Sequence, residues 1–204
     1  MENRLNNNLK VAPSANIESD VEFGDDVTVW GNSHLRSKSR IGDECIIGEN
    51  VYVGSNVSIG KRCKIQNNAQ IYEGSKIEDG VFVGPSVLMT NDHNPRAINE
   101  DSTIKKSTDW DLVGVTIKSG ASIGAGAILI APIIIGNWSM VAAGAVVTKS
   151  VPNFALVAGV PAKQIGWVGK KGKKLIELSE GKYLCPDSTQ HYALDSDELK
   201  EIMT

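Results

Sequence analysis

The chain has 204 residues and a formal net charge of −3 at pH 7, which indicates neither a nucleic-acid surface nor another polyanion-binding surface. Only 5% of the residues are aromatic, and no apolar run reaches the roughly 18 residues that a membrane span needs. The first ten residues (MENRLNNNLK) are polar and lack the apolar core of a signal peptide. We therefore expect a cytoplasmic protein with no membrane or nucleic-acid partner.

After a polar lead-in over residues 1–10, an apolar residue recurs at every sixth position from Val11 to Met89. A second column, four positions after each of these, holds no residue larger than valine from Ala15 to Val87. This period fits neither a helix, at about 3.6 residues per turn, nor a continuous strand, at about two. It predicts short strands separated by corners, with one large and one small side chain inward. In Ile41-Gly42 and similar pairs, a glycine directly follows the large apolar residue. We expect this glycine to adopt the unusual φ and ψ angles that a corner needs.

The pattern resembles the hexapeptide-repeat, left-handed parallel β-helix, in which three hexads make one coil of a triangular prism. The resemblance implies an all-β fold of about seven coils over residues 11–166. Cys45 and Cys63 are 18 residues apart in the small column, so we expect them to stack in adjacent coils. Free thiols are favoured over a disulfide or a metal pair, because adjacent parallel side chains rarely have disulfide geometry.

The period breaks at Thr90 and resumes at Ile117. The 28 residues from Met89 to Ile117 are not a multiple of six, so an insertion of 16 or 22 residues is predicted at a corner, over about 90–115. A long irregular loop inside a rigid repeat is usually functional.

The repeats end after Pro152, and residues 167–204 form a tail that is first lysine-rich and then mixed. We expect this tail to cap the open end of the prism or to pack on a neighbouring subunit. Within it, 175–178 is predicted as a short helix or strand, 183–186 as a turn and 195–203 as a short acidic helix.

Two segments near the end of the repeats, 142–152 and 159–163, resemble the C-terminal signature of hexapeptide acyltransferases that use acetyl-CoA. The resemblance implies acetyl-CoA as co-substrate and a homotrimer with sites between adjacent prisms. It also implies a set of cofactor-binding residues: Ala143 and Gly144 for the pantetheine arm, Lys149 and Lys163 for the CoA phosphates, and Pro161 in the same segment. The backbone N–H of Ala125 or Gly126 is our candidate oxyanion donor. The three histidines share no face at the 18-residue spacing, so we expect no metal.

A narrower resemblance covers most of the chain and is carried by Gln66-Asn67-Asn68, Tyr72-Glu73-Gly74 and Asn94-Pro95-Arg96. The chain is similar here to N-acetyltransferases acting on UDP-2-acetamido-3-amino-2,3-dideoxy-glucuronate. It departs from them at Asp92-His93, and its Asn91-Asp92 pair also resembles acetyltransferases of dTDP-3-amino-3,6-dideoxyhexoses. The resemblance implies transfer of acetyl to the 3-amino group of a nucleotide-linked sugar, for glycan synthesis. The alternatives are the dTDP-sugar reaction and a non-catalytic β-helix scaffold.

The acceptor site is expected beneath the inserted loop. Glu73 and Asn91 are 18 residues apart, which places them about 4.8 Å apart on adjacent coils. We expect the acceptor to be held by Asn67, Asn68, Tyr72, Glu73 and Arg96. The resemblance implies that Asn91 orients the amine without a dedicated base, and we favour this reading. His93 is the alternative, as general base.

Overall fold

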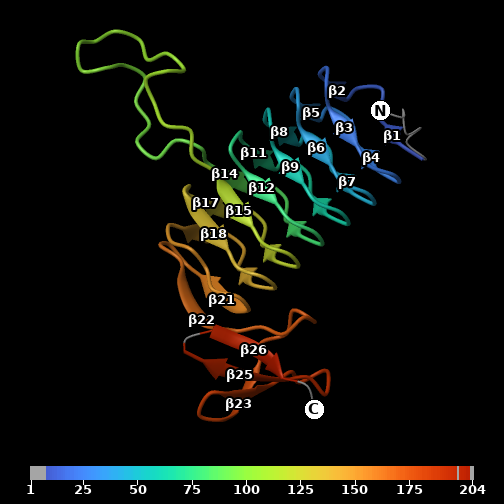
Figure 1. Ribbon diagram of the computed structural model, residues 1–204, viewed down its shortest axis with the longest axis vertical. Coiled ribbons are helices and arrows are strands. Elements are labelled where there is room, and N and C mark those ends of the chain that lie inside the picture. The colour runs from blue at the N-terminus through green and yellow to red at the C-terminus, as the bar shows by residue number, and fades with distance from the viewer. Residues whose placement is uncertain (1–7, 197, 203–204) are drawn as a thin grey trace.

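The computed structural model describes residues 8–196 and 198–202, and every regular element among them is a β-strand. The fold is a left-handed parallel β-helix, and Figure 1 shows its stacked coils with a long loop projecting from one side and a small sheet at the C-terminal end. The coils build three parallel sheets, which we call A, B and C in the order in which the chain visits them.

Sheet A contains β1 (Lys10–Val11), β4 (Thr28–Val29), β7 (Ile46–Ile47), β10 (Lys64–Ile65), β13 (Phe82–Val83), β16 (Ser122–Ile123), β19 (Met140–Val141) and β21 (Ala155–Ala158), with β22 (Lys163–Trp167) added antiparallel. Sheet B contains β2 (Asn16–Ile17), β5 (His34–Leu35), β8 (Tyr52–Val53), β11 (Gln70–Ile71), β14 (Leu88–Met89), β17 (Ile128–Leu129) and β20 (Val146–Val147). Sheet C contains β3 (Glu22–Phe23), β6 (Arg40–Ile41), β9 (Ser58–Ile59), β12 (Lys76–Ile77), β15 (Val115–Ile117) and β18 (Ile133–Ile135). These strands amount to the predicted seven or so coils.

The two inward columns form the core. Large residues such as Leu35, Ile71 and Leu129 are fully buried, as are small ones such as Val51 and Ala127. Register follows the predicted spacing, because Ile71 pairs with Met89 and therefore with the residue 18 positions on. At the N-terminal end the column is open, and Val11 is 39% exposed. The prism is thus a stack of hydrophobic layers whose outer faces are left for other roles.

The predicted role of the glycines after the large column is wrong. The left-handed φ angle falls two residues later, as at Glu44 (58°), Asn50 (56°) and Asn68 (63°), where the chain uses mostly non-glycine residues. Glycine is required at the earlier position by the coil above: a Cβ on Gly42 would lie 2.7 Å from the carbonyl carbon of Gly60. The glycines therefore permit close stacking of coils rather than unusual corner angles.

The inserted loop has the longer of the two predicted lengths. Ile77 pairs with Ile117, which is 40 residues on instead of 18 and so leaves 22 inserted residues. The insertion leaves the prism between β14 and β15, at the corner between sheets B and C (Figure 1). Antiparallel bridges join Asp92 to Leu112 and Ile98 to Ile104, so the two arms of the loop run side by side.

The cysteine prediction is confirmed. Cys45 and Cys63 are free and buried on adjacent coils, with the Cys63 N–H 3.4 Å from the Cys45 sulfur. Each thiol donates to a backbone carbonyl, Cys45 to Gly60 at 3.0 Å and Cys63 to Glu78 at 3.1 Å. They act as small core residues that also satisfy corner carbonyls.

The tail is an antiparallel sheet of β23 (Ile176–Ser179), β24 (Lys182–Leu184), β25 (His191–Asp195) and β26 (Glu198–Ile202). The predicted acidic helix over 195–203 is therefore wrong, and so is the start of the predicted turn, because Tyr183 and Leu184 lie in a strand. Tyr192 and Leu199 are buried against Phe154 of the last coil, and the Phe154 and Tyr192 ring centroids are 5.4 Å apart. Burial against the prism selects strands over local helical propensity.

Candidate functional site

The base of the inserted loop holds an oriented imidazole. His93 Nδ1 lies 3.2 Å from the backbone oxygen of Ala131, and Thr90 Oγ1 in turn accepts the Ala131 N–H at 3.0 Å. A carbonyl oxygen can only accept, so Nδ1 carries the hydrogen of the neutral ring. The other nitrogen, Nε2, then presents a lone pair. This arrangement suits a general base, and neither Thr90 nor Ala131 was predicted as part of it.

Beside His93 is a pocket of about 400 Å³ between the two arms of the loop. Its lining residues are Asp92, His93, Asn94, Lys105, Asp109, Trp110, Asp111, Val113 and Pro132. The N–H of Lys106 and the amide of Asn99 donate to Asp109, which lowers the pKa of that carboxyl below its ordinary value. Three carboxylates thus face one lysine, and the pocket is electronegative at neutral pH.

A second feature lies at the corner between sheets A and B. A Cβ placed on Gly126 or Gly144 would meet no atom within 4 Å, so this corner is open to the outside. The N–H groups of these two glycines donate to the coil below, to Pro85 and Ala125 respectively, both at 2.8 Å. The Gly126 N–H is therefore not available as an oxyanion donor. The N–H groups of Ala125 and Ala143 find no acceptor among the described residues.

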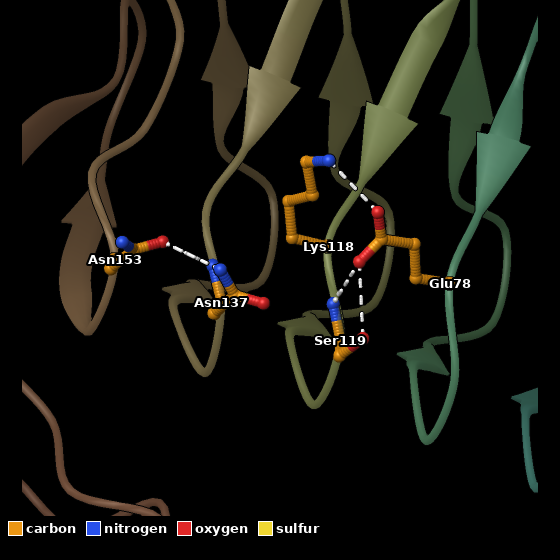
Figure 2. Close-up of polar contacts among 5 residues, drawn as sticks. All are labelled: Glu78, Lys118, Ser119, Asn137 and Asn153. Carbon is orange, nitrogen blue, oxygen red and sulfur yellow. Dashed lines mark hydrogen bonds and ion pairs between the residues drawn. The ribbon is translucent and has the colours of Figure 1, made fainter.

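At some of the other corners the equivalent N–H group is capped by a side chain of the next coil. Figure 2 shows this at the corner between sheets C and A, where Asn153 Oδ1 accepts the Asn137 N–H at 2.7 Å and Glu78 accepts the Ser119 N–H at 3.2 Å. The same carboxylate binds Lys118 at 2.8 Å. That hydrogen bond is the main reason that the pKa of Glu78 is lowered. The N–H groups of Ala125 and Ala143 have no such cap among the described residues, and they are two outward donors on adjacent coils, about 4.8 Å apart.

The predicted site residues divide between the two edges of sheet B. At the B–C corner are Tyr72, Glu73, Asn91, His93 and Lys149, with Arg96 further out in the loop. At the A–B corner are Asn67, Asn68, Ala125, Gly126, Ala143 and Gly144. Pro161 lies in the turn after β21, which is hydrogen-bonded to β20 through Gly159 and Ala162, and Lys163 follows as the first residue of β22. One chain does not bring these two sets together.

The expected cradle of Asn67, Asn68, Tyr72 and Glu73 is therefore not one cluster in a single chain. The asparagines precede β11 and the other pair follows it, so a whole strand of sheet B separates them. Asn67 caps the N–H of Glu49 at 3.0 Å, and its neighbour Asn68 accepts from Asn50 at 3.3 Å. These hydrogen bonds join adjacent coils at the corner, so both asparagines have a structural role there. Arg96 bonds only the carbonyl of Pro95 among the described residues.

Two family models match the chain. Residues 29–108 match the GMPPB C-terminal domain, and residues 113–149 match the hexapeptide repeat of succinyl-transferase.

No helix of the described residues is long and apolar enough to cross a membrane. The same residues contain no group of three or more His, Cys, Asp or Glu side chains that could hold a metal ion.

The chain is similar to acetyltransferases over part of their lengths. A dTDP-3-amino-3,6-dideoxy-alpha-D-galactopyranose 3-N-acetyltransferase of Aneurinibacillus thermoaerophilus is 48% identical over 59 residues, which are 29% of this chain and 31% of that protein. A serine acetyltransferase of Buchnera aphidicola is 31% identical over 102 residues, which are 48% of this chain and 37% of that protein. The chain spans about a third of the length of these curated relatives.

Solved structures share the fold. A hexapeptide-repeat acetyltransferase from Vibrio cholerae, solved with acetyl coenzyme A, has a TM-score of 0.52 at 23% identity and covers 62% of this chain and 69% of its own. A galactoside acetyltransferase solved with coenzyme A has a TM-score of 0.50 at 23% identity, and the match covers 64% of this chain and 66% of that protein. At this identity the likeness establishes the architecture, the hexapeptide-repeat β-helix.

Proposed function

We propose that this hexapeptide-repeat chain is an acetyl-CoA-dependent N-acetyltransferase that acetylates the amino group of a nucleotide-linked amino sugar. The observation that carries the proposal is His93, whose Nδ1 is bonded to a backbone carbonyl so that Nε2 is free beside a pocket. The likeness to a relative named as a dTDP-amino-sugar N-acetyltransferase supports the reaction type.

The chemistry requires one proton acceptor and one oxyanion donor. The free-base amine attacks the thioester carbonyl carbon, and the new C–N bond forms while the carbonyl oxygen gains negative charge. The N–H of Ala125 or Ala143, uncapped by the protein, donates to that oxygen. His93 Nε2 takes the proton from nitrogen. As the C–S bond breaks, the imidazolium returns this proton to the thiolate of CoA.

His93 and the uncapped N–H groups lie at opposite edges of sheet B, so the complete site is formed by two copies of the chain. The A–B corner of one prism supplies Ala125, Gly126, Ala143, Gly144 and the turn with Pro161 and Lys163. The B–C corner of its neighbour supplies His93, Asn91 and Lys149. A closed ring of three prisms uses every such pair of corners once, which supports a homotrimer.

Asn91 has a positioning role in this proposal. Its carbonyl accepts the N–H of Val113 at 3.1 Å, which holds the two arms of the loop together next to His93. Its amide side chain can hydrogen-bond the acceptor but has no basic lone pair at neutral pH. We therefore assign the proton transfer to His93 and orientation of the acceptor to Asn91.

The charge of the loop pocket distinguishes the two candidate acceptors. Asp92, Asp109 and Asp111 outnumber Lys105 around the pocket, and like charges raise the free energy of a bound anion. A 6-deoxy amino sugar carries no carboxylate, whereas a glucuronate does. We expect the dTDP-3-amino-3,6-dideoxyhexose to be the better acceptor, with the UDP-glucuronate derivative as second candidate.

The direct test is purified protein with acetyl-CoA and a panel of UDP- and dTDP-linked 3-amino sugars, followed by release of free thiol and by mass of the sugar product. We expect thiol release that depends on the amine, with N-acetylated product in equal amount. Thiol release at the same slow rate with and without every amine would refute the proposal and favour a non-catalytic scaffold.

A further inference from the structure

A row of stacked side chains climbs the outer edge of sheet B below the inserted loop. The Tyr52 and Tyr72 ring centroids are 5.4 Å apart with planes tilted by 52°, and His34 meets Tyr52 edge-on at 5.8 Å. We call Tyr52 and Tyr72 the tyrosine shelf. The other ring pair among the described residues, Phe154 with Tyr192, is part of the core beneath the tail. The shelf instead lies on the surface, where Tyr72 is 37% exposed and Tyr52 is half-buried.

The shelf is held in place from below. Arg36 donates to the Tyr52 hydroxyl at 3.3 Å, and its guanidinium is paired with Glu18. Glu18 also accepts from the backbone N–H of Ser37 at 2.9 Å, and its pKa is lowered chiefly by that hydrogen bond. Gly54 occupies the position between Arg36 and Tyr72 on the middle coil. Because Gly54 has no side chain, the Tyr52 ring can occupy the space between Arg36 and Tyr72 and contact both of them.

The shelf ends at the proposed reaction centre. Ile71 pairs with Met89, so Tyr72 is level with Thr90 on the next coil, and Thr90 binds the residue that orients His93. Tyr52 is one coil further from the loop, paired with Gln70. The rings therefore lie about 5 to 10 Å below the loop along the stack. A ligand with one end held at His93 can therefore reach the rings by extending along the stack toward the N-terminal coils.

We infer that the tyrosine shelf binds the base of the nucleotide carried by the acceptor sugar, a site distinct from the loop pocket that holds the sugar. The inference rests on the proposed function, because it uses His93 to place the sugar end. Every base presents a flat π-face, and stacking on an aromatic side chain is favourable without sequence-specific hydrogen bonds. The shelf thus selects nucleotide-linked over free amino sugars and accepts either pyrimidine base.

The experiment compares three variants of the full chain. Tyr52→Ala removes the lower ring, Tyr52→Phe keeps the ring and loses only the contact with Arg36, and Phe82→Ala removes a 40% exposed ring on sheet A as a control. Calorimetry measures binding of UDP and of dTDP without sugar. Kinetics measure KM for the nucleotide sugar, kcat, and KM for acetyl-CoA.

We expect Tyr52→Ala to weaken nucleotide binding and raise KM for the nucleotide sugar by roughly ten- to a hundredfold. The kcat and the KM for acetyl-CoA stay within about twofold, because the ring touches neither reacting group. Tyr52→Phe and Phe82→Ala bind nucleotide within about threefold of the parent chain.

Several outcomes would overturn the inference. They are UDP and dTDP failing to bind the parent chain, Tyr52→Ala binding them unchanged, and Tyr52→Phe losing as much as Tyr52→Ala. Dissociation of the assembly by Tyr52→Ala, seen by sedimentation, would instead assign the shelf to a contact between copies. Acetylation of amino sugars that is insensitive to the nucleotide would keep the proposed function and remove only this site. Nucleotide binding at the shelf with no acetyl transfer would do the reverse.

Discussion

Replacing His93 decides how the amine loses its proton. His93 is exposed and its ring makes one hydrogen bond, to the Ala131 carbonyl, so His93→Ala should change stability by no more than about 0.5 kcal/mol. Catalysis should change far more, because a positioned general base contributes about 10²- to 10⁴-fold. We expect kcat to fall by that factor, which corresponds to about 3 to 5 kcal/mol of lost transition-state stabilisation. The KM for acetyl-CoA should be unchanged.

The assay is kcat/KM as a function of pH for three variants. General-base catalysis contributes a limb to the acidic side of this profile in the parent chain, and His93→Ala should lose that contribution. Asn91→Ala should keep the limb and slow the reaction by no more than about tenfold. Thr90→Val is nearly isosteric but cannot accept the Ala131 N–H; it should also keep the limb, with kcat lowered about three- to tenfold because Ala131 no longer holds the ring.

The opposite pattern would refute the assignment of the base. If His93→Ala slows the reaction less than fivefold while Asn91→Ala slows it about a hundredfold, then the amine needs only orientation. The reading favoured from the sequence, Asn91 without a base, would then be correct.

Three further predictions follow from the corners and the assembly. Gly144→Trp should abolish acetyl-CoA binding in calorimetry. The fold should survive this change, because Asn50 and Asn68 are non-glycine residues with the same positive φ in the same corner. Gly80→Trp, at an open position of the C–A corner, is the control and should bind acetyl-CoA normally. Glu78→Gln should lower stability at pH 7 by about 1 kcal/mol. The hydrogen bond from Lys118 is the main reason that the pKa of Glu78 is lowered. This contribution to stability is therefore present above the ordinary pKa of a glutamate and is lost as the pH falls through the lowered pKa. The difference in Tm between the variant and the parent chain should close over the same fall in pH. Sedimentation should show a trimer at micromolar concentration, and a stable monomer would remove the two-copy site.

The repeat itself could be predicted from the sequence because the core of a β-helix is periodic. Each inward position, such as Ile71 or Met89, is defined by its distance from the previous one, and no long-range information is needed. The tail lacks this property. Tyr192 and Leu199 are ordered by Phe154 of the last coil, a contact that no local pattern encodes. The local sequence pattern after Asp195 therefore predicts an acidic helix where the structure has a strand.

The site could be predicted by type but not by arrangement. His93 and Asn91 were found because they follow a break in the period. The size of the insertion was ambiguous by six residues, and so Ala131 could not be placed opposite His93 in advance. Likewise, Asn67 and Asn68 are close to Tyr72 in the sequence, and this proximity predicts a single cluster. In the structure the chain passes to another face of the prism every six residues, so the asparagines and Tyr72 lie at different corners.

The uncapped corner provides a test that removes one N–H group and little else. Ala143 occupies the position that Pro13 and Pro85 hold in earlier coils of the same A–B corner, and Ala12 before Pro13 matches Ala142 before Ala143. The backbone there accepts proline, so Ala143→Pro should leave Tm within about 2 °C. Its N–H has no acceptor among the described residues, so no internal hydrogen bond is lost.

If acetyl-CoA takes a hydrogen bond from this group, Ala143→Pro should weaken its binding by about 3- to 12-fold, since one such bond contributes roughly 0.5 to 1.5 kcal/mol. Ala143→Ser keeps the N–H and should bind within about twofold of the parent chain. Unchanged affinity in the proline variant, together with unchanged kcat, would exclude the Ala143 N–H as donor and leave the Ala125 N–H at the same corner. The same result in Ala125→Pro would mean that the acyl donor lies along a different edge of the prism.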